Sequence, residues 1–299
     1  MTDLSVVIPS FNTKDITKSC LDALTQNLVG NSTVTAEIIV IDNASIDGSK
    51  QMLEKFIDNH SDKFIQIKLL FNKKNLGYPK ANNQGIEKAQ GKFILLLNSD
   101  AIVEDIDFNE LFDYFKQDSK VAGLTVKVKL PTGQIDQASH RGFPTLWNSF
   151  CYFSGLEKVF GSVGGLNKIF GGYHLKHLDL ETPHEIDSGS GAFYLFRKDI
   201  LEKVGGFDDK SFFFYGEDLD LSYRIKESGY KIVYYPKFTV LHLKYASGLS
   251  KQNTVIRKQA KNHFYEAMKI FYEKHYEKKH FWLLNKAVYF LIDIKKKIS

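Results

Sequence analysis

The chain has 299 residues, of which 43% are hydrophobic and 25% are charged, a composition that excludes disorder for most of its length. Its 40 basic and 35 acidic residues give a net charge of +5, a small and scattered excess that does not indicate a nucleic-acid partner. The two cysteines, Cys20 and Cys151, lack the spacing of a zinc site or a disulfide scaffold and are typical of a reducing compartment.

The N-terminal residues carry no pattern of a secretory signal. The chain reads directly into the apolar run Leu4–Pro9, without a basic stretch or a small-residue cleavage site. The longest apolar stretch, near 281–294, is interrupted by Asn285, Lys286 and Asp293, and is too short to span a membrane. We therefore expect a cytoplasmic protein without a transmembrane segment.

Four apolar, β-branched runs in the first hundred residues predict strands, at 5–8, 37–41, 65–71 and 92–97. Segments with helical periodicity separate them, each long enough for a crossover helix. This alternation predicts an α/β fold with a doubly wound, mainly parallel central sheet flanked by helices. In such sheets ligands bind at the carboxyl ends of the strands.

Polar residues stand at each of these predicted strand ends. Pro9, Ser10 and Asn12 follow the first strand, Asp42 follows the second, and Asn98-Ser99-Asp100 follows the fourth. Carboxylates here can bind a nucleobase, a ribose or the Mg²⁺ or Mn²⁺ of a diphosphate. At any single position, strand termination and helix capping explain such residues as well. Their joint placement on one sheet edge favours a binding site.

A polar turn at 75–85 opens a helix and could bring backbone amides close to a ligand. Its glycines do not have the spacing of a Walker A loop or a GxGxxG fingerprint. The residues singled out in it are Asn75, Gly77, Lys80 and Asn83. A helix start with an asparagine-rich cap explains the turn equally well.

The regular alternation of predicted strands and helices ends near residue 125. Glycine- and aromatic-rich segments such as 161–172 predict loops around a site, and ordered structure resumes at 187–197. The last fifty residues have helical patterns rich in lysine and aromatic residues. We predict one domain over 1–248, with its parts dividing near 125, and a C-terminal helical extension over 249–299.

The segment 212–224 places an aromatic run before Gly216 and then three acidic residues, Glu217, Asp218 and Asp220, at a predicted helix start. Acidic residues commonly complement a helix dipole there, but three beside an aromatic wall favour a catalytic site. His242 follows a predicted strand at 232–235. A single histidine in an apolar run is more often a core residue than a ligand.

Taken in order, these segments resemble the family 2 glycosyltransferases, which have the GT-A fold, and especially their rhamnosyltransferase-like branch. The resemblance covers residues 4 to about 247, roughly four fifths of the chain. It rests on the segments 6–12, 41–48, 75–78, 97–100, 190–192, 204–208, 214–221 and 241–242.

The resemblance implies a role for several residues. Asp42 would bind the donor base, Asp100 and His242 would hold a divalent cation, Mn²⁺ or Mg²⁺, and Asp218 would be the catalytic base, with Glu217 as its competitor. The nucleotide-sugar site would comprise Pro9, Ser10, Asn12, Asp42, Asn75, Gly77, Lys80, Asn83, Asn98, Ser99 and Asp100, and the acceptor site Ser190, Gly191, Phe214 and Tyr215.

Two positions depart from the family pattern. Asn98 stands where the metal-binding triplet often has an aspartate, which leaves Asp100 as its one carboxylate. Leu243 stands where members of the rhamnosyltransferase-like branch often have a second histidine. Both departures bear on metal affinity and on the choice of sugar.

The resemblance implies an inverting, metal-dependent hexosyltransferase. Its donor would be a nucleotide sugar, dTDP-rhamnose first and a UDP-sugar second, and its acceptor a hydroxyl of a cell-surface glycan, lipid-linked oligosaccharide or glycolipid. The alternatives are a nucleotidyltransferase, for which the turn at 9–13 lacks a basic triphosphate loop, and a non-catalytic carbohydrate-binding protein, which the 14% aromatic content would suit.

For residues 278–299, docking on an anionic membrane and packing on the domain remain equal alternatives.

Overall fold

Four parallel strands form the first half of a central sheet. The computed structural model describes residues 2–30, 33–59, 65–244 and 254–298. The strands are β1 (Leu4–Ser10), β2 (Ala36–Asp42), β3 (Ile65–Phe71) and β4 (Phe93–Leu96), in the spatial order β3-β2-β1-β4. All their pairings are parallel, so the four predicted strands and their direction are confirmed.

Beyond β4 the sheet becomes mixed. It continues as β8-β6-β9-β5, and β7 pairs with β9. The bounds are β5 (Ala101–Val103), β6 (Val121–Lys129), β7 (His184–Ile186), β8 (Tyr194–Arg197) and β9 (Lys231–His242). Strand β9 is longer than the 232–235 predicted, because its second half pairs with both β6 and β5. His242 is therefore the last residue of a strand.

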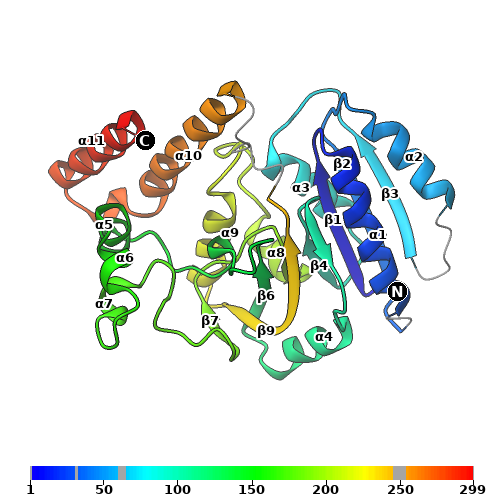
Figure 1. The fold of residues 1–299 in the computed structure, drawn as a ribbon, viewed down its shortest axis with the longest axis horizontal. Coiled ribbons are helices and arrows are strands. Elements are labelled where there is room, and N and C mark those ends of the chain that lie inside the picture. Colours follow the sequence, from blue (N-terminus) through cyan, green and yellow to red (C-terminus); the bar gives the residue numbers. More distant parts are fainter. Residues whose placement is uncertain (1, 31–32, 60–64, 245–253, 299) are drawn as a thin grey trace.

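Helices cover both faces of the sheet (Figure 1). Val6 and Ile8 face a core shared with α1 (Lys14–Gly30), α2 (Ser49–Asn59) and α4 (Phe108–Gln117). Val7 faces the opposite core, which packs against α3 (Tyr78–Lys88), α8 (Lys198–Val204) and α9 (Glu217–Glu227). Successive strand residues point to opposite faces, which explains why these buried strands are apolar at nearly every position.

The region after β6 holds a short 3-10 turn, Gln137–Ser139, and three short helices. These are α5 (Leu146–Ser154), α6 (Leu156–Phe160) and α7 (Asn167–Phe170). The prediction of loops over 161–172 is wrong at 167–170, where one helical turn forms between glycine-rich segments. A turn this short leaves no periodicity that a sequence pattern could reveal.

The C-terminal region is helical, as predicted, with α10 (Thr254–His275), a 3-10 turn (Glu277–Lys279) and α11 (Trp282–Ile298). The proposed boundary at 248/249 lies outside the described residues. Figure 1 shows α10 and α11 beside α5–α7, at the end of the molecule away from β3. Helix α10 packs its Ala267 and Phe271 against Phe212 and Tyr223 of the α9 region.

Asp220 anchors α10 to the domain. Its side chain is fully buried, and its Oδ1 accepts a hydrogen bond of 2.8 Å from His275 Nε2. Its Oδ2 accepts from Arg224 Nε at 2.9 Å, and Lys274 lies 2.7 Å from Oδ1. Asp220 thus has a structural role, although it belongs to the same acidic segment as Glu217 and Asp218.

We expect Asp220→Ala to lower the free energy of unfolding by about 1–3 kcal/mol, because the buried His275 loses its hydrogen-bond acceptor while Arg224 and Lys274 lose an ion-pair partner. Urea denaturation measures this change. The control is Asp22→Ala, which removes one partner of the exposed Lys18–Asp22 pair and should change stability by about 0.5 kcal/mol or less. Equal effects of the two substitutions would contradict the anchoring role.

Candidate active site

One cavity of about 1090 Å³ runs from the carboxyl ends of β1 and β4 to the C-terminal helices. Most residues predicted for the site line it, although they come from distant parts of the chain. These residues are Pro9, Ser10, Asn75, Gly77, Asn98, Ser99, Asp100, Ser190, Gly191, Phe214, Tyr215, Glu217, Asp218 and His242. The sheet topology thus brings the predicted donor, metal, acceptor and catalytic residues to one cavity.

The turn that opens α3 forms one wall of this cavity. Gly77 has φ +88°, and a Cβ built on it would lie 2.7 Å from the carbonyl oxygen of Phe213. Asn75 Oδ1 accepts a hydrogen bond of 2.9 Å from the Gly77 amide, and the Tyr78 hydroxyl donates to Asn98 Oδ1 at 2.7 Å. Only glycine fits at residue 77, since both its φ and its close contact exclude a side chain.

Asp42 and Asn12 lie beside the cavity rather than in its lining. Asp42 is buried at the end of β2, where its Oδ1 accepts from the Ser45 amide at 2.9 Å. Its Oδ2 has no hydrogen-bond partner among the described residues. Asn12 has φ +53° and accepts from the Ile46 amide at 2.8 Å, which fixes the loop next to Asp42. A buried carboxylate oxygen without a partner remains consistent with a ligand at Asp42.

Lys80 and Asn83, predicted as donor-binding residues, do not line the cavity, and their side chains make other contacts. The Asn83 side-chain amide donates to Phe207 O at 2.8 Å and accepts from the Phe207 amide at 2.9 Å. Lys80 pairs with Asp209 at 3.0 Å. Both side chains therefore join α3 to the loop at 206–209, because the helix presents this face to that loop.

Asp100 and His242 meet through strand pairing. The antiparallel register of β5 and β9 sets Ala101 opposite His242, although 141 positions separate them. His242 Nε2 lies 3.1 Å from Asp100 Oδ1, and both side chains are buried. A carboxylate and an imidazole in contact could each supply one ligand to a divalent cation.

Asp136 orients His242 from the other side of its ring. Its Oδ2 lies 2.7 Å from His242 Nδ1, and its Oδ1 accepts from Lys244 Nζ at 2.9 Å. Burial disfavours the imidazolium, but the hydrogen bonds to Asp100 and Asp136 outweigh it and raise the pKa of His242 to about 9. In the described part of the chain, no three or more His, Cys, Asp or Glu side chains are arranged so that together they could hold a metal ion.

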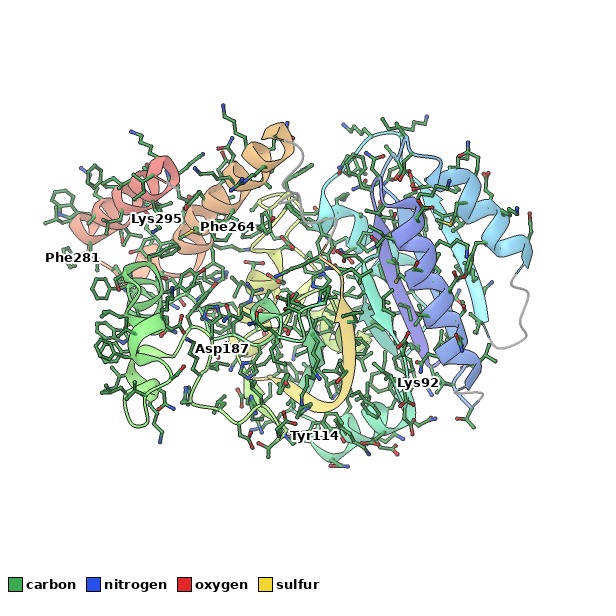
Figure 2. The ribbon with its side chains drawn as sticks, viewed as in Figure 1. Lys92, Tyr114, Asp187, Phe264, Phe281 and Lys295 are labelled. Carbon is green, nitrogen blue, oxygen red and sulfur yellow. The ribbon has the colours of Figure 1, made fainter. Side chains whose placement is uncertain are left out.

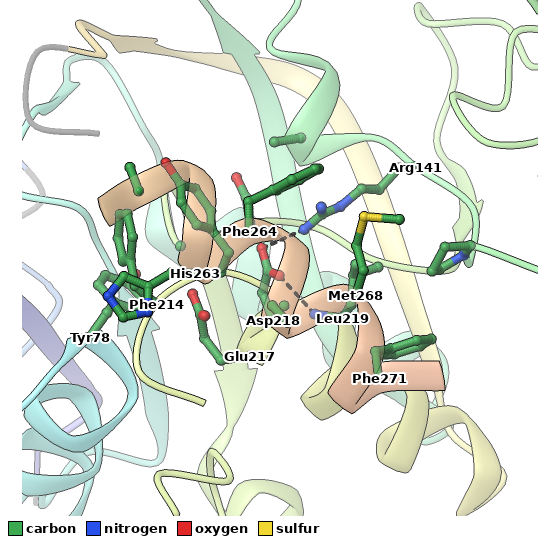
Figure 3. Close-up of a pocket in the computed structure, with 18 of the residues that line it drawn as sticks. Tyr78, Arg141, Phe214, Glu217, Asp218, Leu219, His263, Phe264, Met268 and Phe271 are labelled. Carbon is green, nitrogen blue, oxygen red and sulfur yellow. Dashed lines mark hydrogen bonds and ion pairs between the residues drawn. The ribbon is translucent and has the colours of Figure 1, made fainter. Parts of the chain in front are cut away.

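Glu217 and Asp218 begin α9, directly after Gly216, which has φ +80°. Asp218 Oδ2 accepts a 2.5 Å hydrogen bond from Arg141 Nη2, and its Oδ1 accepts from the Leu219 amide at 2.8 Å. Figure 3 shows Arg141 facing Asp218, with Glu217 on the side of Tyr78 and Phe214. The Asp218 carboxylate is therefore held in one orientation inside the cavity.

Glu217 differs from Asp218 in its electrostatic environment. Burial and the neighbouring charge of Asp218 raise the pKa of the Glu217 carboxyl to about 8. Its Oε2 is buried and has no hydrogen-bond partner among the described residues. At neutral pH Glu217 is mostly a neutral carboxylic acid, which can donate a hydrogen bond to a ligand.

The predicted acceptor residues lie around this pair. The Ser190 hydroxyl is buried without a partner in the described residues, and Gly191 lies against the Tyr78 hydroxyl. Phe214 packs edge-on to Tyr78 with 6.4 Å between ring centroids, and Tyr215 packs against Phe264 of α10 at 5.9 Å. The C-terminal extension thus supplies part of the cavity wall.

Sequence reasoning did not identify Arg141, Asp136 or the wall formed by α10. Arg141 and Asp136 lie in the irregular segment after β6 and belong to no recognisable motif. They reach the site because β6 pairs with β9, which places that segment beside His242 and α9. The contribution of α10 could have been predicted, because aromatic residues such as Phe264 and Phe271 recur there at helical spacing and mark an apolar helix face.

A sheet whose parallel half ends in polar residues at a cavity, with carboxylates in the cavity lining, is typical of nucleotide-binding α/β enzymes. The profile of glycosyl transferase family 2 matches residues 5–205, and that of glycosyl transferase family group 2 matches 174–290. The chain therefore belongs to glycosyl transferase family 2, as the sequence motifs implied.

Several curated proteins are similar in sequence. The N-acetylglucosaminyl-diphospho-decaprenol L-rhamnosyltransferase of Mycobacterium tuberculosis is 27% identical over 220 residues, 69% of this chain and 66% of its own length. The cholesterol galactosyltransferase of Borreliella burgdorferi is 33% identical over 116 residues, 39% of this chain and 30% of its own. The poly-beta-1,6-N-acetyl-D-glucosamine synthase of Staphylococcus epidermidis is 24% identical over 202 residues, 67% of this chain and 41% of its own length. The chain spans less than two thirds of each relative.

Solved structures with the GT-A fold are similar in architecture. A mannosyltransferase of Pyrobaculum calidifontis, in complex with GDP-Man and Mn²⁺, has a TM-score of 0.57 at 15% identity. The match covers 88% of this chain and 62% of the mannosyltransferase chain. GalNAc-T7, in a structure with UDP, GalNAc and Mn²⁺, has a TM-score of 0.59 at 17% identity. This match covers 91% of our chain and 50% of GalNAc-T7. The fold is GT-A, as expected.

Proposed function

We propose that this chain is an inverting hexosyltransferase that moves a sugar from a nucleotide-diphosphate donor to an acceptor hydroxyl. The favoured donor is dTDP-rhamnose and the second is a UDP-sugar; the acceptor is a cell-surface glycan, a lipid-linked oligosaccharide or a glycolipid. The observation that carries the proposal is a single cavity lined by Asp100 and His242 as well as by Glu217 and Asp218. Similarity to the mycobacterial rhamnosyltransferase supports the choice of donor.

Asp100 and His242 are the residues that would hold a divalent cation, Mn²⁺ or Mg²⁺. The donor set fits once a cation displaces the proton from His242 Nε2, because a carboxylate oxygen and an imidazole nitrogen lie in contact at the cavity wall. Asp136 fixes the imidazole from its Nδ1 side, as outer carboxylates commonly do for metal-binding histidines. When bound, the cation would stabilise the negative charge of the leaving diphosphate.

Asp218 is the group that would take the proton from the attacking hydroxyl. Arg141 and the Leu219 amide orient its carboxylate, which leaves lone pairs for the acceptor. Glu217, with its raised pKa, would donate a hydrogen bond that orients the acceptor. A single base that activates the acceptor for in-line attack gives inversion at the anomeric carbon, with no covalent intermediate.

The test of this function is a donor-hydrolysis panel across nucleotide sugars, since slow transfer to water reports the donor without requiring the acceptor. We expect release of dTDP from dTDP-rhamnose above all others. Lys116→Ala, which alters an exposed side chain on α4, should keep the wild-type profile. Hydrolysis of no nucleotide sugar, together with turnover of nucleoside triphosphates, would support a nucleotidyltransferase instead.

We also propose that the C-terminal end of the molecule docks on an anionic membrane surface. Exposed apolar side chains gather on α11 and on α5–α7, which lie together (Figure 1). This apolar platform comprises Trp147, Phe150, Val159, Ile169, Phe281, Trp282, Leu283, Phe290 and Leu291. Lys296 and Lys297 lie in the last turn of α11 and would contact anionic headgroups. Figure 2 places Phe281 at the outer tip of the molecule.

Helix α11 can pack on the domain with one face and contact a membrane with another. Helix α11 buries Asn285 and Ile292, whereas Trp282 and Phe290 are 66% and 65% exposed. In the described part of the chain, no helix has the length and apolar character to cross a membrane. An interfacial position, with one helix face in the headgroup region, is what such a distribution favours.

The double substitution Trp282→Glu with Phe290→Glu is expected to reduce co-sedimentation with vesicles of anionic lipid at least tenfold, because it places two carboxylates on the platform. Val29→Glu makes the same kind of change on α1, at a side chain that is 55% exposed, and should leave vesicle binding intact. Equal vesicle binding by wild type and the double variant would contradict the docking proposal.

A further inference from the structure

The cavity continues past the catalytic carboxylates into an arm with apolar walls. Its lining there includes Phe153 of α5, Met268 and Phe271 of α10, and Val288 and Ile292 of α11. Figure 3 shows Met268 and Phe271 on the same helix as Phe264, beside Arg141 and Asp218. The arm is therefore continuous with the site at which the acceptor hydroxyl would be activated.

The two walls of the arm approach each other closely. Lys295 of α11 places its Nζ 5.6 Å from the ring centroid of Phe153 on α5. On the other side, α11 packs along α10, where Tyr272 donates a hydrogen bond of 2.8 Å to Asn285 Oδ1. Three helices thus enclose a slot whose walls consist largely of aliphatic and aromatic carbon.

We infer that this arm holds the hydrocarbon chain of the acceptor, so that the acceptor of the proposed transfer is a lipid. The inference rests on the proposed function, and it assigns one component of the acceptor to a stated part of the cavity. Aliphatic walls formed by Met268, Val288 and Ile292 suit an alkyl or polyprenyl chain. A glycan would need hydrogen-bond partners for each ring. The polar side chains that the same helices add to the lining, such as Tyr152, Ser154, Tyr272 and Lys295, are too few to pair with every ring.

The surroundings of the arm agree with a lipid occupant. Leu291, Ile294 and Ile298 line the cavity and are exposed, so the arm opens on the apolar platform. Next to it, the lining of a second groove includes four lysines, Lys258, Lys261, Lys296 and Lys297, and one carboxylate, Asp293. A chain withdrawn from a membrane would thus enter between apolar side chains, while lysines attract the anionic headgroups of that membrane.

The test measures binding of n-alkyl β-glucosides, from hexyl to dodecyl, to the full-length protein by calorimetry below their micelle concentrations. Each methylene buried in the arm should tighten binding by up to about fourfold. Met268→Trp and Val288→Trp would fill the arm, and each should weaken binding of the dodecyl compound at least tenfold while changing the hexyl compound little. Ala287→Trp, at an exposed position of α11 outside the cavity lining, should follow the wild type.

The outcomes separate this inference from the proposed function. Binding that does not tighten with chain length in the wild type, or that weakens equally in Ala287→Trp, overturns the lipid arm even if donor hydrolysis is normal. A wild type that hydrolyses no nucleotide sugar overturns the transferase, whatever its alkyl binding. If one filled variant does not fold by circular dichroism, the other variant and the wild-type series decide the question.

Discussion

Replacing Asp218 with asparagine is expected to lower sugar transfer by about 10²–10⁴-fold, the usual contribution of a positioned general base. Asparagine has nearly the same shape, and its single amide oxygen can still accept from either Arg141 or the Leu219 amide, although not from both. It cannot take a proton from the acceptor. The affinity for the nucleotide should therefore change little, and kcat should carry the loss.

Glu217 provides the comparison, because it is the nearest other carboxyl. If its neutral form orients the acceptor, transfer should fall as the pH rises through its pKa of about 8. If Glu217 were the base, transfer should instead rise with pH over the same range. A variant Asp218→Asn with near-normal turnover beside an inactive Glu217→Gln would exchange the two roles. Activity in both variants would contradict the assignment of this segment.

The first half of the fold could be predicted because its signals are local. Strands β1–β4 are continuous apolar runs, and the polar residues after them lie at one sheet edge as parallel pairing requires. Gly77 and Asn98 were singled out for the same reason, since Gly77 directly precedes a predicted helix and Asn98 directly follows the predicted strand at 92–97. Periodicity and strand ends are properties that a single sequence displays.

The remaining site residues depend on contacts between distant segments. Asp136 and Arg141 reach His242 and Asp218 across 106 and 77 positions, and no spacing rule connects them. Lys80 and Asn83 were assigned to the donor site because they are polar residues near Gly77. Which face of α3 meets the cavity is decided by the loop at 206–209, and this tertiary contact has no local pattern.

The acidic segment of α9 shows how one motif can serve two purposes. Glu217 and Asp218 line the cavity, whereas Asp220, two residues further along the helix, points to α10 and binds His275. Residues two apart lie on different helix faces, so this division could be predicted. The partner could not, because nothing in the sequence relates Asp220 to a histidine 55 residues away.

Replacing Asp100 with alanine is expected to abolish metal-dependent binding of dTDP or UDP. Asp100 carries the one carboxylate of the Asn98-Ser99-Asp100 triplet, and its oxygen lies 3.1 Å from His242 Nε2. Without it, His242 would be the remaining member of the proposed ligand pair. The measurement is the thermal shift produced by nucleotide with and without Mn²⁺, in wild type and variant.

His242→Ala should cause a smaller loss, because diphosphate oxygens and water can fill part of the coordination sphere of a hard cation. Asp113→Ala, at an exposed carboxylate of α4, is the matched control and should keep the wild-type shift with Mn²⁺. A variant Asp100→Ala that retains this shift, or a wild type fully active in excess chelator, would contradict the metal assignment. Loss in Asp100→Ala alone, with His242→Ala unchanged, would leave Asp100 as a ligand and reduce His242 to a partner that orients the Asp100 carboxylate.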